Sequence, residues 1–180
     1  MIILFGAAGS GKSVQGQRLA EKYNFRWLSV GQLLRNQNDP ELEAIMLKGE
    51  LVPDDFVVKM MHAAGEEALV AGQNAILDGY PRDDWQANWI VENGDAEKID
   101  GAIILKVSHD ELWNRLQERG REDDTKESIQ KRWELFEQTI YSMSETLSKA
   151  GVKIQEVHGE GTIEEVTARI EEVLRGWSII

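Results

Sequence analysis

Cysteine is absent from the 180-residue chain, which also contains only three prolines and no long apolar run. Without cysteine, neither disulfide bonds nor zinc sites built from thiolates can form, and we expect no zinc. No apolar run approaches the ~20 residues that a helix needs to cross a bilayer. The apolar start, residues 1–5, is too short for a signal peptide and has no basic flank. We therefore expect a cytoplasmic protein that does not enter a membrane.

Basic side chains are in the minority, because 20 Lys and Arg residues stand against 32 Asp and Glu residues and give a formal net charge of -12. A general nucleic-acid-binding surface requires a basic face, so we expect no nucleic-acid partner. The hydrophobic content of 42% and the charged content of 29% are ordinary for a globular protein. The chain length suits a single domain with room for a substantial core.

The most informative segment is a glycine-rich loop close to the N-terminus. Residues 6–13 read Gly-Ala-Ala-Gly-Ser-Gly-Lys-Ser and match the phosphate-binding pattern G-x-x-x-x-G-K-S/T. An apolar run over residues 2–5 precedes this loop and a helical pattern over residues 12–23 follows it, which is the context that the pattern requires. The loop therefore predicts a nucleoside triphosphate ligand. A glycine-rich turn between a strand and a helix, without a ligand, is the alternative.

Three physical features of the loop favour a polyphosphate. Its glycines let successive backbone N–H groups turn toward one anion, and the following helix adds its positive N-terminal end. Lys12 can reach the β- and γ-phosphates, while the Ser13 hydroxyl can ligate Mg²⁺. The loop residues that we assign to the triphosphate are Gly6, Gly9, Ser10, Gly11, Lys12, Ser13 and Val14.

Short apolar runs alternate with helical patterns along the chain, which is typical of a parallel sheet with crossover helices. We expect strands at residues 1–5, 75–77, 102–107 and 153–157, and a weaker strand at 26–28. Helices are expected at residues 12–23, 30–36, 40–48, 54–71, 85–93, 110–119, 126–150 and 163–176. Nearly continuous apolar strands indicate a sheet that is covered on both faces. Between about residues 30 and 58 no long apolar run occurs, which predicts a helical insertion at the rim of the sheet.

Asp78 ends one expected strand in the run Ile-Leu-Asp-Gly, residues 76–79. In phosphate-loop proteins, a carboxylate at the end of a neighbouring strand faces the metal site, so Asp78 is predicted to organise Mg²⁺ directly or through water. An Asp that forms a turn before glycine is the structural alternative. Arg82 follows at once and adds a guanidinium to the same loop, which favours the functional interpretation.

An acidic protein that binds a polyphosphate has to gather its few arginines near the ligand loops, and the sequence shows such clusters. Arg35 follows Ser29 and Gly31 on an expected helix, where it can pair with a phosphate through two hydrogen bonds. A capped helix with an exposed arginine is the common alternative. Arginines 115, 119, 121 and 132 lie within 18 residues, on two expected helices and their connection. They either converge on one anion or form ordinary surface pairs with nearby acids, which contribute little.

Taken together, these segments resemble adenylate kinase and its relatives among the nucleoside monophosphate kinases over nearly the whole chain. The segments that carry the resemblance are the phosphate loop with Gln15, residues 20–23, 28–35 and 49–54, residues 77–82 with Gln86, and residues 121–124 with Arg132. The resemblance implies an α/β fold of the P-loop NTPase type, with five parallel strands in the order 2-3-1-4-5. It also implies transfer of the γ-phosphoryl group of MgATP to a nucleoside monophosphate. AMP is the favoured acceptor, UMP or CMP or a broad specificity is the alternative, and a nucleotide-binding regulator without turnover is the remote one.

The resemblance implies roles for individual residues as well. Around the transferring phosphoryl group it places Lys12, Arg82, Arg119, Arg121 and Arg132. Near the adenine of the donor it places Arg115, which can stack on the base, and the backbone of Gly161 and Thr162. To the acceptor it assigns Ser29, Val30, Arg35, Val52, Gly79, Arg82 and Gln86. Phosphoryl transfer depends on positioning and charge stabilisation, so no nucleophilic side chain is expected.

The sequence also departs from the family pattern. Val30 stands where typical adenylate kinases carry threonine, whereas Gln86 is the choice typical of adenylate kinases, so the two residues disagree about the acceptor base. Gln32 replaces the usual aspartate, which predicts slightly weaker organisation of Mg²⁺. The lid is very short, residues 120–125, and joins a core of residues 1–29, 59–119 and 126–180 to which the acceptor-binding insertion, residues 30–58, is attached. Within this single domain we expect a monomer whose partners are the nucleotides ATP, AMP and ADP.

Six tryptophans are many for a chain of this length. Four of them, Trp85, Trp89, Trp113 and Trp133, fall on expected helices and are predicted to pack in the core or cover it. Trp177 lies in the apolar tail of residues 176–180. This tail either docks on the domain or mediates dimerisation, and docking is the favoured interpretation.

Overall fold

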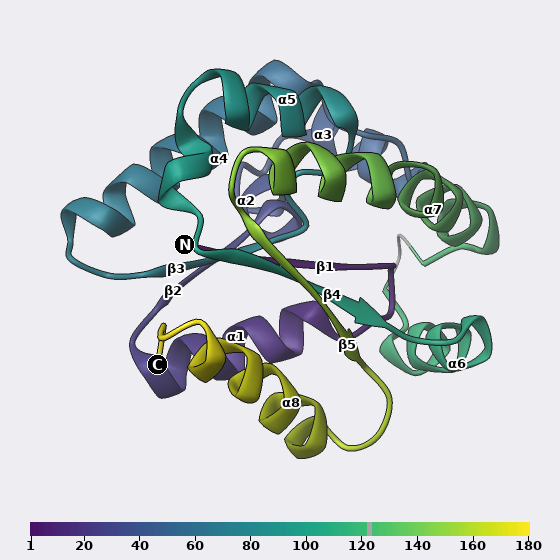
Figure 1. The fold of residues 1–180 in the computed structure, drawn as a ribbon. Helices are drawn as coiled ribbons and strands as arrows, with labels where there is room; N and C mark the ends of the chain where they lie inside the picture. The colour runs from purple at the N-terminus through teal and green to yellow at the C-terminus, as the bar shows by residue number, and fades with distance from the viewer. Residues whose placement is uncertain (122–123) are drawn as a thin grey trace.

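The computed structural model describes residues 1–121 and 124–180, and Figure 1 shows its ribbon. Five parallel strands form one sheet in the order β2-β3-β1-β4-β5. The strands are β1 (Ile2–Gly6), β2 (Arg26–Ser29), β3 (Ala75–Asp78), β4 (Gly101–Lys106) and β5 (Lys153–His158). The predicted fold class and strand order are confirmed, and each strand lies within one or two residues of its expected position.

Helices cover both faces of this sheet (Figure 1). On one face lie α1 (Lys12–Tyr23) and α8 (Ile163–Gly176), and over the other lie α4 (Asp54–Val70), α5 (Asp84–Glu92) and α7 (Lys126–Lys149). The remaining helices are α2 (Val30–Arg35), α3 (Pro40–Leu47), α6 (His109–Arg119) and the unpredicted 3₁₀ turn η1 (Asp95–Lys98). In the described part of the chain, no helix combines the length and the apolar character needed to cross a membrane.

The side chains of β1 explain why its sequence is apolar without alternation. Ile3 and Phe5 belong to the apolar cluster beneath α4, α5 and α7, whereas Ile2 and Leu4 belong to the cluster beneath α1 and α8. Successive residues of a strand point to opposite faces of the sheet. All four side chains are at most 3% exposed, so both faces of the central strand are dry.

β5 departs from the continuous apolar pattern that we predicted for the strands. Lys153, Gln155 and Glu156 are exposed, while Val157 is buried. The reason is its place in the sheet, because β5 is one of the two edge strands and pairs only with β4. Charged side chains on an edge strand also discourage pairing with another chain.

The insertion at residues 30–58, all of which are described, contains α2, α3 and the start of α4 and no strand. It meets α7 at Gly49, whose φ is +70°. A Cβ atom on Gly49 would lie 2.7 Å from the carbonyl oxygen of Ser128 and 2.8 Å from its Cα. Beside this contact, the Lys131 Nζ lies 3.8 Å from a carboxylate oxygen of Glu50. Glycine is therefore required at position 49 both by the backbone conformation and by the close approach.

The C-terminal tail docks on the domain, as favoured from the sequence. The ring of Trp177 lies against Gly101 at the start of β4, where any Cβ atom would overlap the ring. Ile179 and Ile180 pack beside it against the cluster under α1 and α8. The prediction for Trp85 is wrong, because its side chain is 46% exposed. The buried face of α5 is formed by other residues, Gln86, Ala87 and Ile90.

The docking of Trp177 predicts a measurable contribution to stability. Trp177→Ala should lower the free energy of unfolding by about 2 kcal/mol, below the 3–5 kcal/mol of a fully buried tryptophan because the ring is only partly buried. Trp85→Ala removes an equally large but more exposed ring and should cost less than about 1 kcal/mol. Urea unfolding of both variants measures the difference, and equal losses would contradict the docking role.

Candidate functional site

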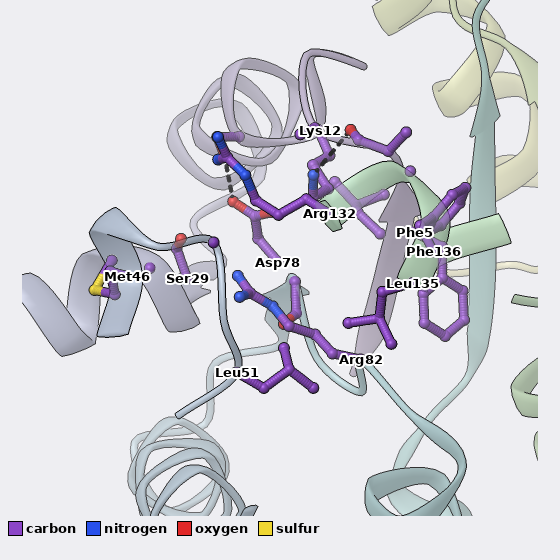
Figure 2. A pocket seen from close by; sticks show the side chains of 18 of the residues that line it. Phe5, Lys12, Ser29, Met46, Leu51, Asp78, Arg82, Arg132, Leu135 and Phe136 are labelled. Atoms are coloured by element: carbon purple, nitrogen blue, oxygen red, sulfur yellow. Dashed lines mark hydrogen bonds between the residues drawn. The ribbon is translucent and has the colours of Figure 1, made fainter. Parts of the chain in front are cut away.

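A cavity of about 150 Å³ lies beside the glycine-rich loop, at the carboxyl ends of β1, β2 and β3. Segments far apart in the sequence share its wall. The basic residues that line it are Lys12, Arg35, Arg82, Arg119, Arg121 and Arg132. Figure 2 shows the side chains of Lys12, Arg82 and Arg132 grouped around Asp78. All but Arg115 of the arginines singled out in the sequence thus reach one place together with the loop lysine.

The glycine-rich loop connects β1 to α1 and is held from behind by α6 and α7. Gly9 and Gly11 adopt φ values of +91° and +88°. A Cβ on Gly9 would lie 2.7 Å from the carbonyl oxygen of Leu112 in α6. From α7, the indole Nε1 of Trp133 donates a hydrogen bond of 2.9 Å to the carbonyl of Ala8. Residues of two helices, α6 and α7, therefore hold the loop from behind.

The other loop residues assigned to the triphosphate lie around this turn. Gly6 ends β1 and packs so closely on Ser10 that a Cβ would overlap the Ser10 hydroxyl. That hydroxyl is buried and makes no hydrogen bond with the described residues. Val14 is 46% exposed at the start of α1 and presents an apolar surface next to the loop.

Lys12 is the positively charged residue of the phosphate loop itself. Its Nζ donates a 3.2 Å hydrogen bond to the carbonyl of Ala7. Burial lowers the pKa of Lys12 to about 8, against an opposing effect of the Asp78 carboxylate. The nearby guanidiniums, Arg82 foremost, add to the lowering. The lysine is thus poised to lose its proton just above neutral pH in the absence of an anion.

Ser13 and Asp78, which we predicted to hold Mg²⁺, are in direct contact. The Ser13 hydroxyl donates a 2.6 Å hydrogen bond to Oδ2 of Asp78, which is 2% exposed. A hydroxyl and a carboxylate are the hard oxygen ligands that Mg²⁺ prefers, so this pair fits the ion. The indole Nε1 of Trp27 also donates to Oδ2 of Asp78, at 3.2 Å. We did not predict this contact, because Trp27 reads as an ordinary apolar residue of a weak strand.

Asp124 holds two of the arginines. Its carboxylate accepts hydrogen bonds from Arg119 Nε at 2.8 Å, Arg119 Nη2 at 2.5 Å and Arg132 Nη2 at 3.0 Å. Burial would raise the pKa of Asp124, but the hydrogen bonds from both arginines outweigh it and leave the pKa below its usual value. The sequence left open whether these arginines gather at one place or pair with nearby acids. Arg119 and Arg132 do both, because they line the cavity and also pair with Asp124. Glu122 and Asp123, which belong to the predicted lid, lie outside the described residues.

Arg115 does not line the cavity and lies at the outer end of the loop. It donates to Glu111 at 2.7 Å and to the carbonyl of Ser10 at 3.3 Å, and its guanidinium lies near Gly11. The pKa of Glu160 is lowered by hydrogen bonds from Ser108, and the charge of Arg115 adds to this shift. Arg115 is thus close to the loop that precedes α8.

Gly161 and Thr162 lie in that same loop. Gly161 has a φ of +107°, and Thr162 caps α8 by exchanging hydrogen bonds with Glu165 at 3.2 and 2.8 Å. Gln15 of α1 donates a 3.0 Å hydrogen bond to the carbonyl of Ile163 and ties the loop to the helix that follows the phosphate loop. Arg115, Gly161 and Thr162 do not line the cavity that contains Arg35 and Arg82.

The residues assigned to the acceptor fall into two groups. The residues that line the cavity are Ser29, Arg35, Gly79 and Arg82. The buried residues that do not line it are Val30, Val52 and Gln86, which are 1%, 5% and 1% exposed. Because their side chains face the interior, their contact with an acceptor base stays a prediction.

The amide of Gln86 is fully engaged within the protein. Its Oε1 accepts a 2.9 Å hydrogen bond from the backbone N–H of Arg82, and its Nε2 donates to Asp54 at 2.7 Å. Arg82 in turn donates from Nε to the carbonyl of Gly79 at 2.9 Å. Gln86 therefore braces the loop that carries Arg82 against the start of α4. Sequence spacing alone gives no signal for this bracing role.

Known proteins are similar to this sequence over nearly its whole length. The family described as Adenylate kinase matches residues 4–152. The chain is 33% identical over 181 residues to a protein named Adenylate kinase from Synechococcus sp. (strain WH7803), covering 96% of this chain and 97% of that protein. It is 34% identical over 185 residues to one from Xanthomonas euvesicatoria pv. vesicatoria (strain 85-10), covering 96% and 98%. It is 35% identical over 187 residues to one from Maricaulis maris (strain MCS10), covering 96% and 97%.

The lowered pKa of Lys12 predicts proton uptake when a nucleoside triphosphate binds. The phosphates favour the charged ammonium and raise the pKa of Lys12 from its value of about 8 in the free protein. Above that pH, binding should take up a proton, and affinity should fall by up to about tenfold per pH unit. Titration calorimetry in buffers of different ionisation enthalpy measures the proton count at pH 7, 8 and 9.

The control for this measurement is Lys12→Arg, which keeps a positive charge that does not titrate in this range. When this variant binds the nucleoside triphosphate at pH 9, the side chain of residue 12 should take up no proton. If the variant and the unmodified protein take up the same number of protons, another group is responsible.

Proposed function

The chain belongs to the adenylate kinase family, and on that premise we propose that it transfers the γ-phosphoryl group of MgATP to AMP, which yields two ADP. One observation carries the proposal: Lys12 and arginines from four distant segments line a single cavity at the phosphate loop. A transferring phosphoryl group carries charge on three oxygens, and catalysis consists mainly of positioning and charge stabilisation. The site has the cations that this chemistry needs.

On the donor side, we propose that the amides of residues 6–13 and Lys12 hold the triphosphate of ATP. Ser13 would ligate Mg²⁺ and Asp78 would act through a metal-bound water, a role that the 2.6 Å contact between their oxygens supports. The ion supplies charge neutralisation on the β- and γ-phosphates when it is bound. Arg115 would stack on the adenine next to Gly161 and Thr162.

On the acceptor side, we propose that the insertion of residues 30–58 binds AMP. Arg35 and Arg82 line the cavity from α2 and from the loop after β3, and would pair with the monophosphate. Ser29 and Gly79 would contact the acceptor through the same wall. The braced backbone of Arg82 supports its assignment, because a guanidinium that is already positioned loses little freedom on binding.

Between the two nucleotides, we propose that Arg119, Arg121 and Arg132 stabilise the phosphoryl group in transfer. Asp124 would keep Arg119 and Arg132 together before the substrates arrive and would share them with the phosphates afterwards. Residues 120–125 would act as a minimal lid. Water exclusion would then depend on closure of the insertion over the acceptor.

The activity is tested by measuring ADP formation from MgATP with AMP, UMP and CMP in parallel. AMP should give the highest kcat/KM. Arg132→Ala should lower kcat by about 10²–10³, because it removes a donor to the charge that develops in transfer. A higher kcat/KM with UMP or CMP would overturn the choice of acceptor, and ATP binding without transfer to any of the three would overturn the activity.

The contact between Gly49 and Ser128 predicts that closure of the insertion is sensitive to a single methyl group. Gly49→Ala should raise the KM for AMP about tenfold, because its Cβ would lie 2.7 Å from the Ser128 carbonyl and keep the insertion from docking on α7. Steady-state kinetics with AMP as the varied substrate measures the effect.

Gly72→Ala is the matched control, because Gly72 has the same φ of +70° but a Cβ there meets no atom within 4 Å. Both variants should lose about 1 kcal/mol of stability through backbone strain. Only Gly49→Ala should change the KM. Equal KM values in the two variants would show that the contact with Ser128 plays no part in acceptor binding.

A further inference from the structure

Trp27 lies directly behind the carboxylate that we assign to the metal site. Its indole Nε1 donates a 3.2 Å hydrogen bond to Oδ2 of Asp78, the same oxygen that accepts the 2.6 Å bond from the Ser13 hydroxyl. We propose that Trp27 is a positioning residue that fixes the rotation of the Asp78 carboxylate, so that Oδ1 faces the metal and its water. This inference rests on the proposed role of Asp78 toward Mg²⁺.

The register of the sheet explains how Trp27 reaches Asp78. Trp27 on β2 pairs with Ile76 on β3, two residues before Asp78. Because side chains alternate across a strand, Trp27, Ile76 and Asp78 share the face of the sheet that α1 covers. The ring of Trp27 therefore extends along this face toward the end of β3, where Asp78 borders the cavity.

Gly16 of α1 leaves the space for that ring. A Cβ on Gly16 would lie 2.8 Å from Cδ1 and 2.9 Å from Nε1 of Trp27, so only glycine lets the edge that carries the N–H pass under the helix. α1 is also the helix that begins with Lys12 and Ser13. One short helix thus covers the indole, carries the hydroxyl and follows the phosphate loop.

The two hydrogen bonds leave the oxygens of Asp78 unequal. Oδ2 accepts from both Trp27 and Ser13, while Oδ1 accepts no hydrogen bond from the described residues. The torsion that rotates a carboxylate is broad, so one donor alone holds it loosely. A serine hydroxyl also rotates, whereas the N–H of an indole has a fixed direction in its rigid ring. Trp27 is therefore the donor that sets the plane of the carboxylate.

The competing interpretation is that Trp27 only fills space between α1 and the sheet. Trp27→Phe separates the two roles, because it keeps an aromatic ring and removes the N–H. Trp89→Phe is the matched control, because Trp89 is also partly buried but lies on α5 and contacts His62, away from the cavity. Comparable losses of unfolding free energy would show that the two substitutions disturb packing to the same extent.

The first measurement is the affinity of Mn²⁺, used as a probe of the metal site, for the complex with ATP, followed by electron paramagnetic resonance. Changes in residues that orient a metal ligand typically cost 10–100-fold in affinity. We expect about a tenfold loss for Trp27→Phe and no loss for Trp89→Phe. The Mg²⁺ concentration that half-saturates activity should rise by a similar factor, while the KM for AMP stays unchanged.

The second measurement uses the protein without nucleotide or metal. The indole N–H resonance that disappears in Trp27→Phe identifies Trp27, and its exchange with solvent should become faster in Asp78→Ala, which leaves no side-chain acceptor at that position. If exchange is unchanged, the hydrogen bond to Asp78 does not hold the indole and the inference is overturned. Should Trp27→Phe fail to fold, 3-benzothienylalanine at position 27 keeps the bicyclic shape and replaces the N–H with sulfur.

The outcomes separate this inference from the proposed function. If Asp78→Asn leaves the Mn²⁺ affinity unchanged, the metal role of Asp78 itself fails. If Asp78→Asn weakens Mn²⁺ binding but Trp27→Phe does not, the metal role stands and the positioning role of Trp27 is overturned. If Trp27→Phe and Trp89→Phe weaken Mn²⁺ binding equally, the effect is one of packing and the inference is likewise overturned.

Discussion

The convergence of like charges on one cavity is the constraint on which this site depends. Lys12 and arginines from several segments meet at the phosphate loop of a protein whose net charge is -12. Two carboxylates offset their repulsion from within: Asp78 next to Lys12, and Asp124 between Arg119 and Arg132. The pKa of Lys12 is still lowered to about 8, foremost by burial and in addition by the repulsion that remains from the guanidiniums. A bound polyphosphate would relieve this repulsion, so the charged cavity is suited to binding anions.

The scaffold fixes the backbone around this cavity. β1 is buried on both faces, the phosphate loop is held by α6 and α7, and Gln86 ties the loop of Arg82 to α4. By contrast, the insertion touches α7 through a glycine and one long ion pair. The braced core presents the triphosphate site, and the insertion is suited to closing over an acceptor.

Much of this could be predicted because the signals are local. The strand order followed from a family resemblance, and the strands and helices followed from runs of apolar residues and their period. Prediction failed where the exposure of a residue depends on which other parts of the fold surround it. Trp85 is exposed because other residues of α5 face the core, and β5 is polar because it lies at the edge of the sheet.

The sequence by itself determined the ligand class, since the loop Gly-x-x-x-x-Gly-Lys-Ser encodes an anion site within eight consecutive residues. It also determined which arginines were available. Only the tertiary structure decided what each side chain contacts: that Asp124 joins Arg119 to Arg132, that Gln86 faces inward to Asp54, and that Trp27 reaches Asp78. The physical reason is that these contacts join residues far apart in the sequence. Trp27 and Asp78 are 51 positions apart, and their hydrogen bond depends on the register of β2 and β3 and on the space that Gly16 leaves on α1.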